Sequence, residues 1–262
     1  MAADTEQLAR GYTLVNDTQY DAGLFLIQRL AIEPGMRVLD VGCGPGNLTA
    51  HIADLVGENG SVVGVDPSKE RIAIALESNI RPNLSFSEGR AEDLSRFPAT
   101  SFDIVFVNST FHWVQDQPAA LREFARVLKP GGGRLGISGG SGDFVAAHEK
   151  IKEDVLAREP YREYPEESPP KFLKRRELEK LLDDAGFADR TIVVNKIVKA
   201  AKDAEAMIDW LVTSSSGKTY GGIPEHLRPR AREEMKREWE KLVTEDGIRM
   251  DMELLVTVAV KN

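Results

Sequence analysis

The stretch VLDVGCGPGNLTAHIADLVGENGSVVGVDPS, residues 38–68, decides which fold the sequence predicts. Gly42, Gly44 and Gly46 stand at every second position between two apolar runs, and Asp66 follows twenty positions after the last glycine. A strand that enters a glycine turn and continues as a helix presents backbone N–H groups to a ligand, because no Cβ atom stands in the way. The stretch therefore predicts a ligand site built largely from main chain.

The segments around this stretch alternate between strand and helix patterns. Short apolar runs bounded by Gly, Pro, Asp or Asn predict strands, and they lie at 36–42, 61–66, 83–89, 102–108 and 133–139. Apolar stripes at helical spacing lie at 47–57 and 119–128. Strands and helices that alternate with short connections indicate an α/β fold with a doubly wound, mostly parallel, Rossmann-like sheet over roughly residues 35–140.

The remaining part of the chain has a different pattern. Residues 141–171 include a proline-dense, charged stretch that indicates an exposed connection or flap. Helices are then predicted at 175–187, 203–214 and 224–247, and strands at 190–198 and 250–261. The interposed helices are too long for a simple loop, so we interpret them as a cap over the carboxyl ends of the parallel strands, where open α/β sheets bind ligands.

These patterns predict three domains. The first is an N-terminal helical segment, 1–34, that closes over the ligand, and the second is the sheet core, 35–140. The third, 141–262, contains the remaining strands and an inserted helical cap at about 141–172 and 203–247. No heptad pattern or evident edge-pairing strand indicates an oligomeric state.

Composition excludes several classes of partner. The chain has 262 residues and a formal net charge of -8, which argues against a nucleic-acid partner because polyanions bind to basic faces. No stretch approaches the roughly 18 apolar residues of a membrane helix, and the first twenty residues resemble no secretion signal. A single cysteine, Cys43, agrees with a reducing compartment. The sequence therefore predicts a cytoplasmic protein without a membrane or nucleic-acid partner.

The chemistry of the ligand follows from the spacing. Asp66, at the tip of the next strand, is placed to accept hydrogen bonds from both hydroxyls of a ribose. When the glycines are aligned with the dinucleotide motif G-x-G-x-x-G, the position of the third glycine is occupied by Asn47. The Lys-Ser/Thr pair of a nucleoside-triphosphate loop does not follow the turn either. We therefore expect an adenosine ligand without phosphates.

At these residues the sequence resembles the class I S-adenosylmethionine-dependent methyltransferases. The glycine motif LDVGCGPGNLT is followed in the same order by VDPS, by GRAEDL at 89–94, by FDIVFVNSTFHWVQD at 102–116 and by LREFARVLKPGG at 121–132. With NSTFHWVQDQPAALREF and AEAMIDWLVTS, the chain most resembles the trans-aconitate methyltransferase group of small-acid O-methyltransferases. The resemblance implies a seven-stranded, mostly parallel sheet with the last strand antiparallel, a helical cap insertion, and S-adenosylmethionine as cofactor with S-adenosylhomocysteine as product.

The resemblance also implies which residues bind the cofactor. Asp40 would orient the glycine loop and the methionine amino group, and Asp66 would hold the ribose hydroxyls. The other implied cofactor residues are Tyr20, which would close over the cofactor, Gly42, Gly44 and Gly46 along the methionine and ribose, Pro67, Ala91 and Glu92 at the adenine, and the backbone of Asn108 at the methionine end. Arg90 departs from the family, since many members have an acidic residue there.

The acceptor side of the site is expected beyond the fourth strand. A carboxylate acceptor is already ionised at neutral pH, whereas an amine or phenol would profit from a general base. His112 is the candidate base, because it lies just after that strand; alternatively, His112 and Trp113 pack the cap. The residues predicted to line the acceptor pocket are Tyr12, Trp113, Trp210 and Tyr220, with ordinary core packing as the alternative for the aromatic residues of the cap.

Three classes of function remain open at this stage. The first is methyl transfer to a small molecule, with O-methylation of a carboxylic acid as the leading interpretation and N- or C-methylation as alternatives. The second is an NAD-dependent oxidoreductase, which shares the strand, glycine turn and distant acid. The third is a non-catalytic cofactor-binding protein, because a fold alone does not establish an activity. The other histidines, His51, His148 and His226, have no metal-ligand spacing, so we predict no metal.

Overall fold

The structure, a computed structural model, describes residues 5–187 and 189–261 and divides into two compact units. The sheet unit comprises Asp17–Asp143, Pro170–Asn195 and Leu254–Asn262. The helical unit comprises Met1–Asn16, Phe144–Pro169 and Lys196–Glu253. The predicted boundaries after residues 34 and 140 divide the chain differently, since each unit draws on three separate segments.

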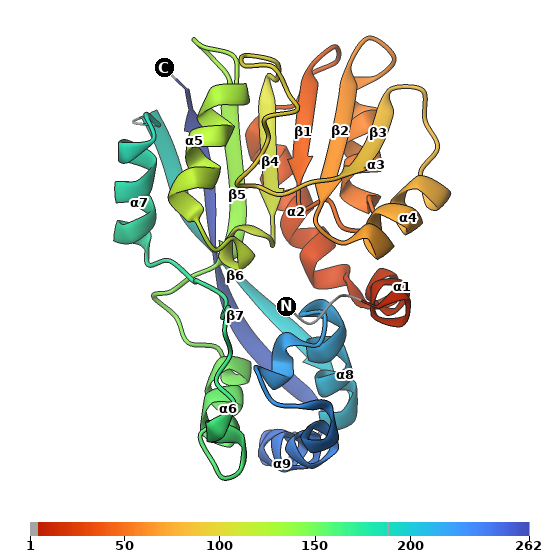
Figure 1. The fold of residues 1–262 in the computed structure, drawn as a ribbon, viewed down its shortest axis with the longest axis vertical. Coiled ribbons are helices and arrows are strands. Elements are labelled where there is room, and N and C mark those ends of the chain that lie inside the picture. Colours follow the sequence, from red (N-terminus) through yellow and green to blue (C-terminus); the bar gives the residue numbers. More distant parts are fainter. Residues whose placement is uncertain (1–4, 188, 262) are drawn as a thin grey trace. The chain divides into compact units, whose positions relative to one another are not determined.

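One seven-stranded sheet runs through the fold in the order β3-β2-β1-β4-β5-β7-β6 (Figure 1). The strands are β1 (Arg37–Val41), β2 (Ser61–Asp66), β3 (Leu84–Glu88), β4 (Ile104–Asn108), β5 (Arg134–Gly140), β6 (Asp189–Ala201) and β7 (Ile248–Val260). Strands β1 to β5 pair in parallel, and β7 pairs antiparallel with β5, from Arg134 opposite Val260 to Gly140 opposite Leu254. The Rossmann-like, mostly parallel sheet with an antiparallel last strand is thus confirmed.

The central strands are apolar on both sides because helices cover both faces of the sheet. Every residue of β4 is buried, and so are the last four residues of β1. A parallel sheet covered on both faces requires such continuous apolar runs. Since parallel neighbours place their carboxyl ends at the same edge, the residues that follow β1, β2 and β4 gather at one edge of the sheet.

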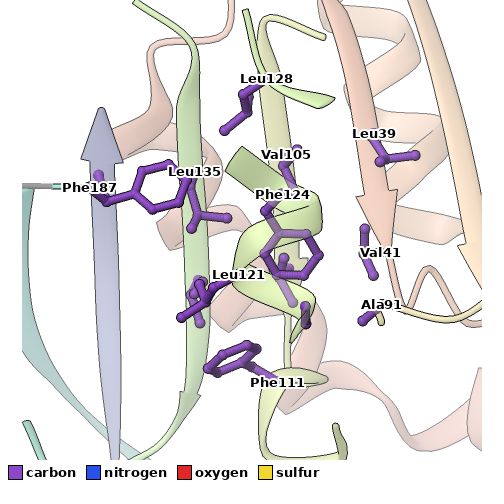
Figure 2. Packing of buried hydrophobic residues seen from close by; sticks show 14 of the residues in the cluster. Leu39, Val41, Ala91, Val105, Phe111, Leu121, Phe124, Leu128, Leu135 and Phe187 are labelled. Carbon is purple, nitrogen blue, oxygen red and sulfur yellow. The ribbon is translucent and has the colours of Figure 1, made fainter. Parts of the chain in front are cut away.

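Helices α5 (Gln117–Val127) and α7 (Arg175–Asp184) cover one face. Their apolar side chains form one cluster with residues of β1, β4 and β5, and Figure 2 shows Leu121 and Phe124 of α5 among Val105, Leu135 and Phe187. Asp116 begins α5 by accepting a hydrogen bond from the N–H of Ala119 at 2.9 Å, with proline in the first turn. Both helices agree with the predicted segments within a few residues.

The other face carries α2 (Asp17–Leu30), α3 (Asn47–Val56) and α4 (Lys69–Ser78). Leu30 of α2 packs so closely on β5 that a Cβ atom at Gly136 would lie 2.6 Å from its side chain. Ser68 begins α4 by accepting from the N–H of Arg71. The sequence reasoning did not assign this helix.

The helical unit contains α1 (Glu6–Val15), α6 (Ala147–Leu156), α8 (Ala204–Ser214) and α9 (Arg228–Glu240). Its core cluster includes Trp239, Tyr161 and Met207, all almost fully buried. The unit therefore has a hydrophobic core of its own.

Two predictions for the helical unit were wrong in detail. Residues 141–171 were predicted as an exposed connection, but α6 lies within them, and Val155 and Tyr161 are buried in the core cluster. Glu149 supplies the side chain that accepts from the N–H of Ala146 at the start of α6, a signal hidden by the prolines that follow. The helix predicted over 224–247 is shorter, because α9 ends at Glu240 and Thr244 and Gly247 then form a tight turn.

Within the described residues, every helix is too short or too polar to cross a membrane. The predicted cytoplasmic location stays a prediction.

Candidate functional site

The glycine turn after β1 is tied to the end of β2 by main-chain hydrogen bonds. The N–H groups of Gly42 and Cys43 both donate to the carbonyl oxygen of Val65, at 2.7 and 3.1 Å. Gly42, Gly44 and Gly46 all have positive φ angles, of 79°, 54° and 86°. Residues with side chains rarely adopt this conformation, so the spacing of the three glycines follows from the path of the turn.

Gly42 also has no room for a side chain. A Cβ atom there would lie 2.1 Å from Oγ1 of Thr110, in the loop that follows β4. The hydroxyl of Thr110 in turn donates to the carbonyl oxygen of Asn108 at 3.0 Å, and lies 3.3 Å from that of Gly42. The loops after β1 and β4 are therefore packed against each other at the carboxyl edge of the sheet.

Asp66 ends β2 and is only 6 % exposed. Its Oδ2 accepts from the N–H of Gly44 at 2.9 Å, and its Oδ1 accepts from the N–H of Ser68 at 2.8 Å. A carboxylate oxygen can accept more than one hydrogen bond, so a contact of Asp66 with a ribose hydroxyl is compatible with these two bonds. Asp66 thus lies directly beside the glycine turn, as the spacing predicted, while its ribose contact stays a prediction.

Asp40, in β1, is a second buried carboxyl group at this edge. Its Oδ2 accepts from Oγ1 of Thr49 at 2.7 Å. Burial raises the pKa of Asp40 to about 7, against the lowering effect of the Thr49 hydrogen bond and with a further rise from the negative charge of Asp66. A cation bound nearby would reverse this shift, whereas an anion such as a pyrophosphate would add to the repulsion.

Asn108, the last residue of β4, connects the sheet to α2. Its Nδ2 donates to the main-chain carbonyl oxygen of Gln19 at 2.8 Å. Among the residues that the structure describes, no donor reaches Oδ1 of Asn108 or Oε1 of Gln19, although both oxygens are buried. The next residue, Ser109, has a positive φ of 53°, a conformation that is uncommon for a residue with a side chain and often marks a functional loop.

Gln19 is a polar residue of this edge that the sequence reasoning missed. It lies next to Tyr20 in the first part of α2, and both are half-buried. No spacing in the sequence connects Gln19 with Asn108, because 89 positions separate them. Only the folded sheet brings the two amides together.

His112 lies in a short 3-10 helix, Phe111–Trp113, that follows the β4 loop. Its ring stacks on Phe172 with centroids 4.8 Å apart and lies 5.0 Å from the ring of Trp113. The segment that carries Phe172 is fixed by main-chain contacts, since the N–H of Lys171 donates to the carbonyl oxygen of His112 at 2.6 Å. The imidazole is therefore held in one orientation.

A shallow depression lies beside His112. It has a volume of only about 20 Å³, room for about one water molecule, and its walls include Phe111, Gly139, Lys171 and Leu178. Its walls are mostly apolar, and in this conformation it is too small for an organic substrate. The role of His112 as a base stays a prediction, and its packing against Phe172 and Trp113 agrees with the alternative of a structural role.

The residues predicted at the adenine lie at the ends of β2 and β3. Ala91 is buried, whereas Pro67 is exposed. Oε1 of Glu92 accepts from the N–H of Gln115 at 3.3 Å, and Oε2 lies 3.8 Å from Nε of Arg90. Arg90, the departure from the family pattern, is thus an ion-pair partner of Glu92.

The remaining predicted substrate residues, Tyr12, Trp210 and Tyr220, belong to the helical unit. Trp210 and Tyr220 are each 6 % exposed and lie in its core cluster. Nη1 of Arg232 lies 3.5 Å from the hydroxyl of Tyr220, and the ammonium of Lys199 lies 5.2 Å from the ring centroid of Trp210. Both rings thus pack in the core of the helical unit, and a contact with substrate stays a prediction.

Two further predictions concern Cys43 and metal ions. Burial raises the pKa of the Cys43 thiol, with further rises from the charges of Asp40 and Asp66, so the thiolate is disfavoured. Over residues 5–187 and 189–261, no three His, Cys, Asp or Glu side chains gather as metal ligands would. The prediction that the protein works without a metal remains a prediction.

Part of the chain that contains this site is similar to known proteins. Residues 39–135, from β1 to the start of β5, match the family model described as "Methyltransferase domain". The ubiquinone/menaquinone biosynthesis C-methyltransferase UbiE of Vibrio vulnificus is 36% identical over 134 residues, which are 48% of this chain and 51% of that protein. The chain thus spans about half the length of the curated relatives it matches.

Solved structures show the same fold at lower sequence identity. The YcgJ protein of Bacillus subtilis superposes with a TM-score of 0.65 at 18% identity, covering 93% of this chain and 99% of that one. Phosphoethanolamine N-methyltransferase 2 of Haemonchus contortus, solved with phosphomonomethylethanolamine and S-adenosylhomocysteine, gives a TM-score of 0.63 at 20% identity, covering 98% of this chain and 58% of that one. Similarity to the trans-aconitate methyltransferase group is not confirmed by these matches.

Proposed function

We propose that this chain, which carries a class I S-adenosylmethionine-dependent methyltransferase domain, transfers a methyl group from S-adenosylmethionine to a small organic acceptor. The observation that carries the proposal is the glycine turn joined to Asp66, with the N–H of Gly44 bonded to the carboxylate at 2.9 Å. A bare main-chain turn beside a buried acid suits a nucleoside that offers hydroxyl donors.

Charge supports a sulfonium cofactor over a dinucleotide. Two buried carboxyl groups, Asp40 and Asp66, lie at the turn, and the main-chain N–H of Gly44 is already bonded to one of them. A pyrophosphate needs free N–H donors and suffers repulsion from these acids, whereas a cationic ligand is stabilised by them. This argument favours S-adenosylmethionine over NAD and agrees with the absence of the third dinucleotide glycine at Asn47.

The residues of this chain would bind the cofactor, orient it toward the acceptor and exclude water. The cofactor, when bound, supplies a methyl group on a positively charged sulfur. The acceptor would form a bond to the methyl carbon as the carbon–sulfur bond breaks in line with it, and the sulfur leaves as a neutral thioether. Asp66 would fix the ribose, and Asp40 would stabilise the positive charge at the methionine end. Holding the donor and the acceptor in contact contributes up to roughly 7–11 kcal/mol to such a displacement.

The acceptor atom determines what His112 does. A carboxylate oxygen, the leading interpretation from the sequence, needs no base. Methylation at carbon, favoured by the similarity to UbiE, needs a base, and His112 is the nearest imidazole to the depression after β4. The similarity covers 48% of the chain, which includes the cofactor part, so it carries more weight for the cofactor than for the acceptor.

The first experiment measures ligand binding by calorimetry with the full chain. We expect S-adenosylhomocysteine to bind and NAD to leave no heat signal. Binding of NAD alone would overturn the proposal in favour of the oxidoreductase.

The second experiment identifies the acceptor. The protein is incubated with methyl-labelled S-adenosylmethionine and a panel of carboxylic acids, amines, phenols and hydroquinones. We expect one class to gain label, and His112→Asn to reduce the rate about a hundredfold or more for a carbon, phenol or amine acceptor but little for a carboxylate. Binding of S-adenosylhomocysteine without any labelled product would instead favour a non-catalytic cofactor-binding protein.

A further inference from the structure

Gln117 is a buried polar residue of the sheet unit to which the proposed function gives no role. It is the first residue of α5 and is only 4 % exposed. Its Nε2 donates to the main-chain carbonyl oxygen of Phe111 at 3.1 Å and to that of Lys171 at 3.0 Å. The side chain thus connects the short helix that contains His112 with the segment that precedes α7.

Both bonds depend on the two N–H groups of one amide. A carbonyl oxygen only accepts hydrogen bonds, so the amide of Gln117 must point its nitrogen at both acceptors. Rotating the amide by half a turn would place its own oxygen against the two carbonyl oxygens. The bridge therefore depends on the donors of Gln117 and not only on the size of its side chain.

The segment that this bridge reaches is held against the loop after β4 by further main-chain bonds. The N–H of Lys171 donates to the carbonyl oxygen of His112 at 2.6 Å. On the other side of Phe172, the carbonyl oxygen of Leu173 accepts from the N–H of Gly142 at 2.8 Å. The main chain is therefore fixed on both sides of Phe172.

The ring of Phe172 in turn contacts the imidazole of His112. The two rings stack with centroids 4.8 Å apart and planes 28° apart. Both rings lie against glycines, since a Cβ atom at Gly140 would lie 2.7 Å from the ring of Phe172 and one at Gly139 would lie 3.4 Å from Nδ1 of His112. Because Nδ1 is buried, Nε2 is the ring nitrogen that can meet a ligand.

We propose that Gln117 is a positioning residue for methyl transfer, which holds Phe172 on the imidazole of His112 and thereby fixes the direction of Nε2. This assignment rests on the proposed function and concerns acceptors that need a base. In that step, Nε2 takes the proton of the acceptor, whose electron pair forms the bond to the methyl carbon as the carbon–sulfur bond breaks. A base must lie within hydrogen-bond reach of the proton, and a displacement of about 1 Å costs about a hundredfold in rate.

Asn83 offers a matched control, because its amide makes the same kind of bridge at the opposite edge of the sheet. Its Nδ2 donates to the carbonyl oxygens of Ala53 and Gly57 at 2.8 and 2.9 Å. Asn83 directly precedes β3, whereas His112 follows β4, and parallel strands place these positions at opposite edges. Asn83→Leu therefore removes two comparable bonds without touching the imidazole.

The first measurement is the NMR spectrum of the full chain with isotope-labelled histidine rings. The His112 signal is assigned by its loss in His112→Asn. An aromatic ring shields protons above its face, so Phe172→Leu should move this signal, and Gln117→Leu should move it in the same direction. Asn83→Leu should leave it in place. An unmoved His112 signal in Gln117→Leu would overturn the assignment.

The second measurement is a double-mutant cycle in the labelled-methyl assay, with the phenol, amine or hydroquinone of the panel that gains label. Gln117→Leu should lower kcat by about tenfold or more and leave the KM for S-adenosylmethionine within about twofold. In a His112→Asn background, the same change should alter kcat by less than about twofold, because the base that Gln117 positions is already gone. Asn83→Leu should leave kcat within about twofold in both backgrounds.

Equal losses of kcat in the two backgrounds would show that Gln117 acts on the structure in general and would contradict positioning. Label on a carboxylate alone would contradict it too, since that acceptor needs no base. If Gln117→Leu does not fold, Phe172→Leu decides in the same cycle, because it removes the stacked ring and keeps the bridge. If no acceptor gains label, the proposed function itself fails, whereas the NMR comparison still shows whether Gln117 holds the ring.

Discussion

The carboxyl edge of the sheet and the helical unit differ in how their charged side chains are paired. In the helical unit, Arg232 bridges Glu205 and Asp209, Arg158 contacts Glu234 and Glu238, and Lys152 pairs with Glu166 at 2.7 Å. At the sheet edge, Asp40 has a neutral hydroxyl as its hydrogen-bond donor and Asp66 has main-chain N–H donors.

This difference separates a structural arrangement from a binding one. Ion pairs that neutralise each other need nothing from outside the protein, and they contribute modestly to stability. A buried acid such as Asp40, which accepts from the neutral hydroxyl of Thr49, is costly in its charged form in the free protein and becomes favourable when a cation binds. The sheet edge is therefore the part of the molecule whose energetics a positively charged ligand changes most.

The largest expected effect is a pH dependence of stability that comes from Asp40. Its pKa is about 7 in the folded protein and 3.8 in the reference state, so the folded protein holds a proton that the unfolded chain has lost between these values. The free energy of unfolding therefore decreases as pH rises from about 4 to 7, by up to about 4 kcal/mol from this group.

We expect thermal melting to show that Asp40→Asn lacks this part of the pH dependence. In the wild type, a saturating concentration of S-adenosylhomocysteine should reduce this dependence of stability on pH, because the ammonium group of the bound ligand stabilises the ionised carboxylate. An unchanged pH profile in Asp40→Asn would contradict the assignment of the titration to Asp40.

The next effect comes from Gly42. A side chain there meets Thr110 and must adopt a positive φ of 79°, so Gly42→Ala should lower the free energy of unfolding by about 2–4 kcal/mol. The matched control is Gly35→Ala, where φ is also positive, at 86°, but nothing lies within 4 Å of the added Cβ. Chemical denaturation should give the control only the conformational cost, about 1–2 kcal/mol. Equal losses in the free energy of unfolding for the two variants would show that the close contact with Thr110 in the β4 loop does not contribute to the cost of Gly42→Ala.

A smaller effect is expected at Asp66. Asp66→Ala removes the acceptor for the N–H of Gly44 and for the ribose, and should weaken binding of S-adenosylhomocysteine by about 1.5–3 kcal/mol in calorimetry. Asp54→Ala, on the exposed side of α3, removes a carboxylate that pairs with Arg81 and should leave the affinity unchanged. Wild-type affinity in Asp66→Ala would remove Asp66 from the ribose role.

The smallest effect is expected in the helical unit. Nζ of Lys152 donates to Glu166 and to the carbonyl oxygen of Lys218, and both side chains of the pair are largely buried. Lys152→Met should cost about 1–2 kcal/mol of stability and leave the affinity for S-adenosylhomocysteine unchanged. Lys180→Met, which breaks the exposed pair with Asp184, should give no measurable change in melting temperature. Weaker cofactor binding in Lys152→Met would contradict a purely structural role for the pair.

The sequence predicted the sheet unit better than the helical unit, for a physical reason. Strands β1 to β5 are short apolar runs with turn residues at both ends, and a parallel sheet covered on both faces requires that pattern locally. Helix α6 was missed because its stability comes from burying Ile151 and Val155 in a core assembled from three separate segments. Nothing in the local sequence of α6 reports that core.

The candidate site likewise has one part that the local sequence predicts and another part that depends on the tertiary structure. The sequence by itself determined the glycine turn and its acid, because a main-chain turn with positive φ at three positions needs glycines at fixed spacing. Only the tertiary structure decided that Gln19 and Asn108 meet, that Thr110 occupies the space beside Gly42, and that Phe172 stacks on His112. Backbone conformation is a local property that residue types encode directly, whereas contacts between distant residues depend on how the strands are ordered in the sheet.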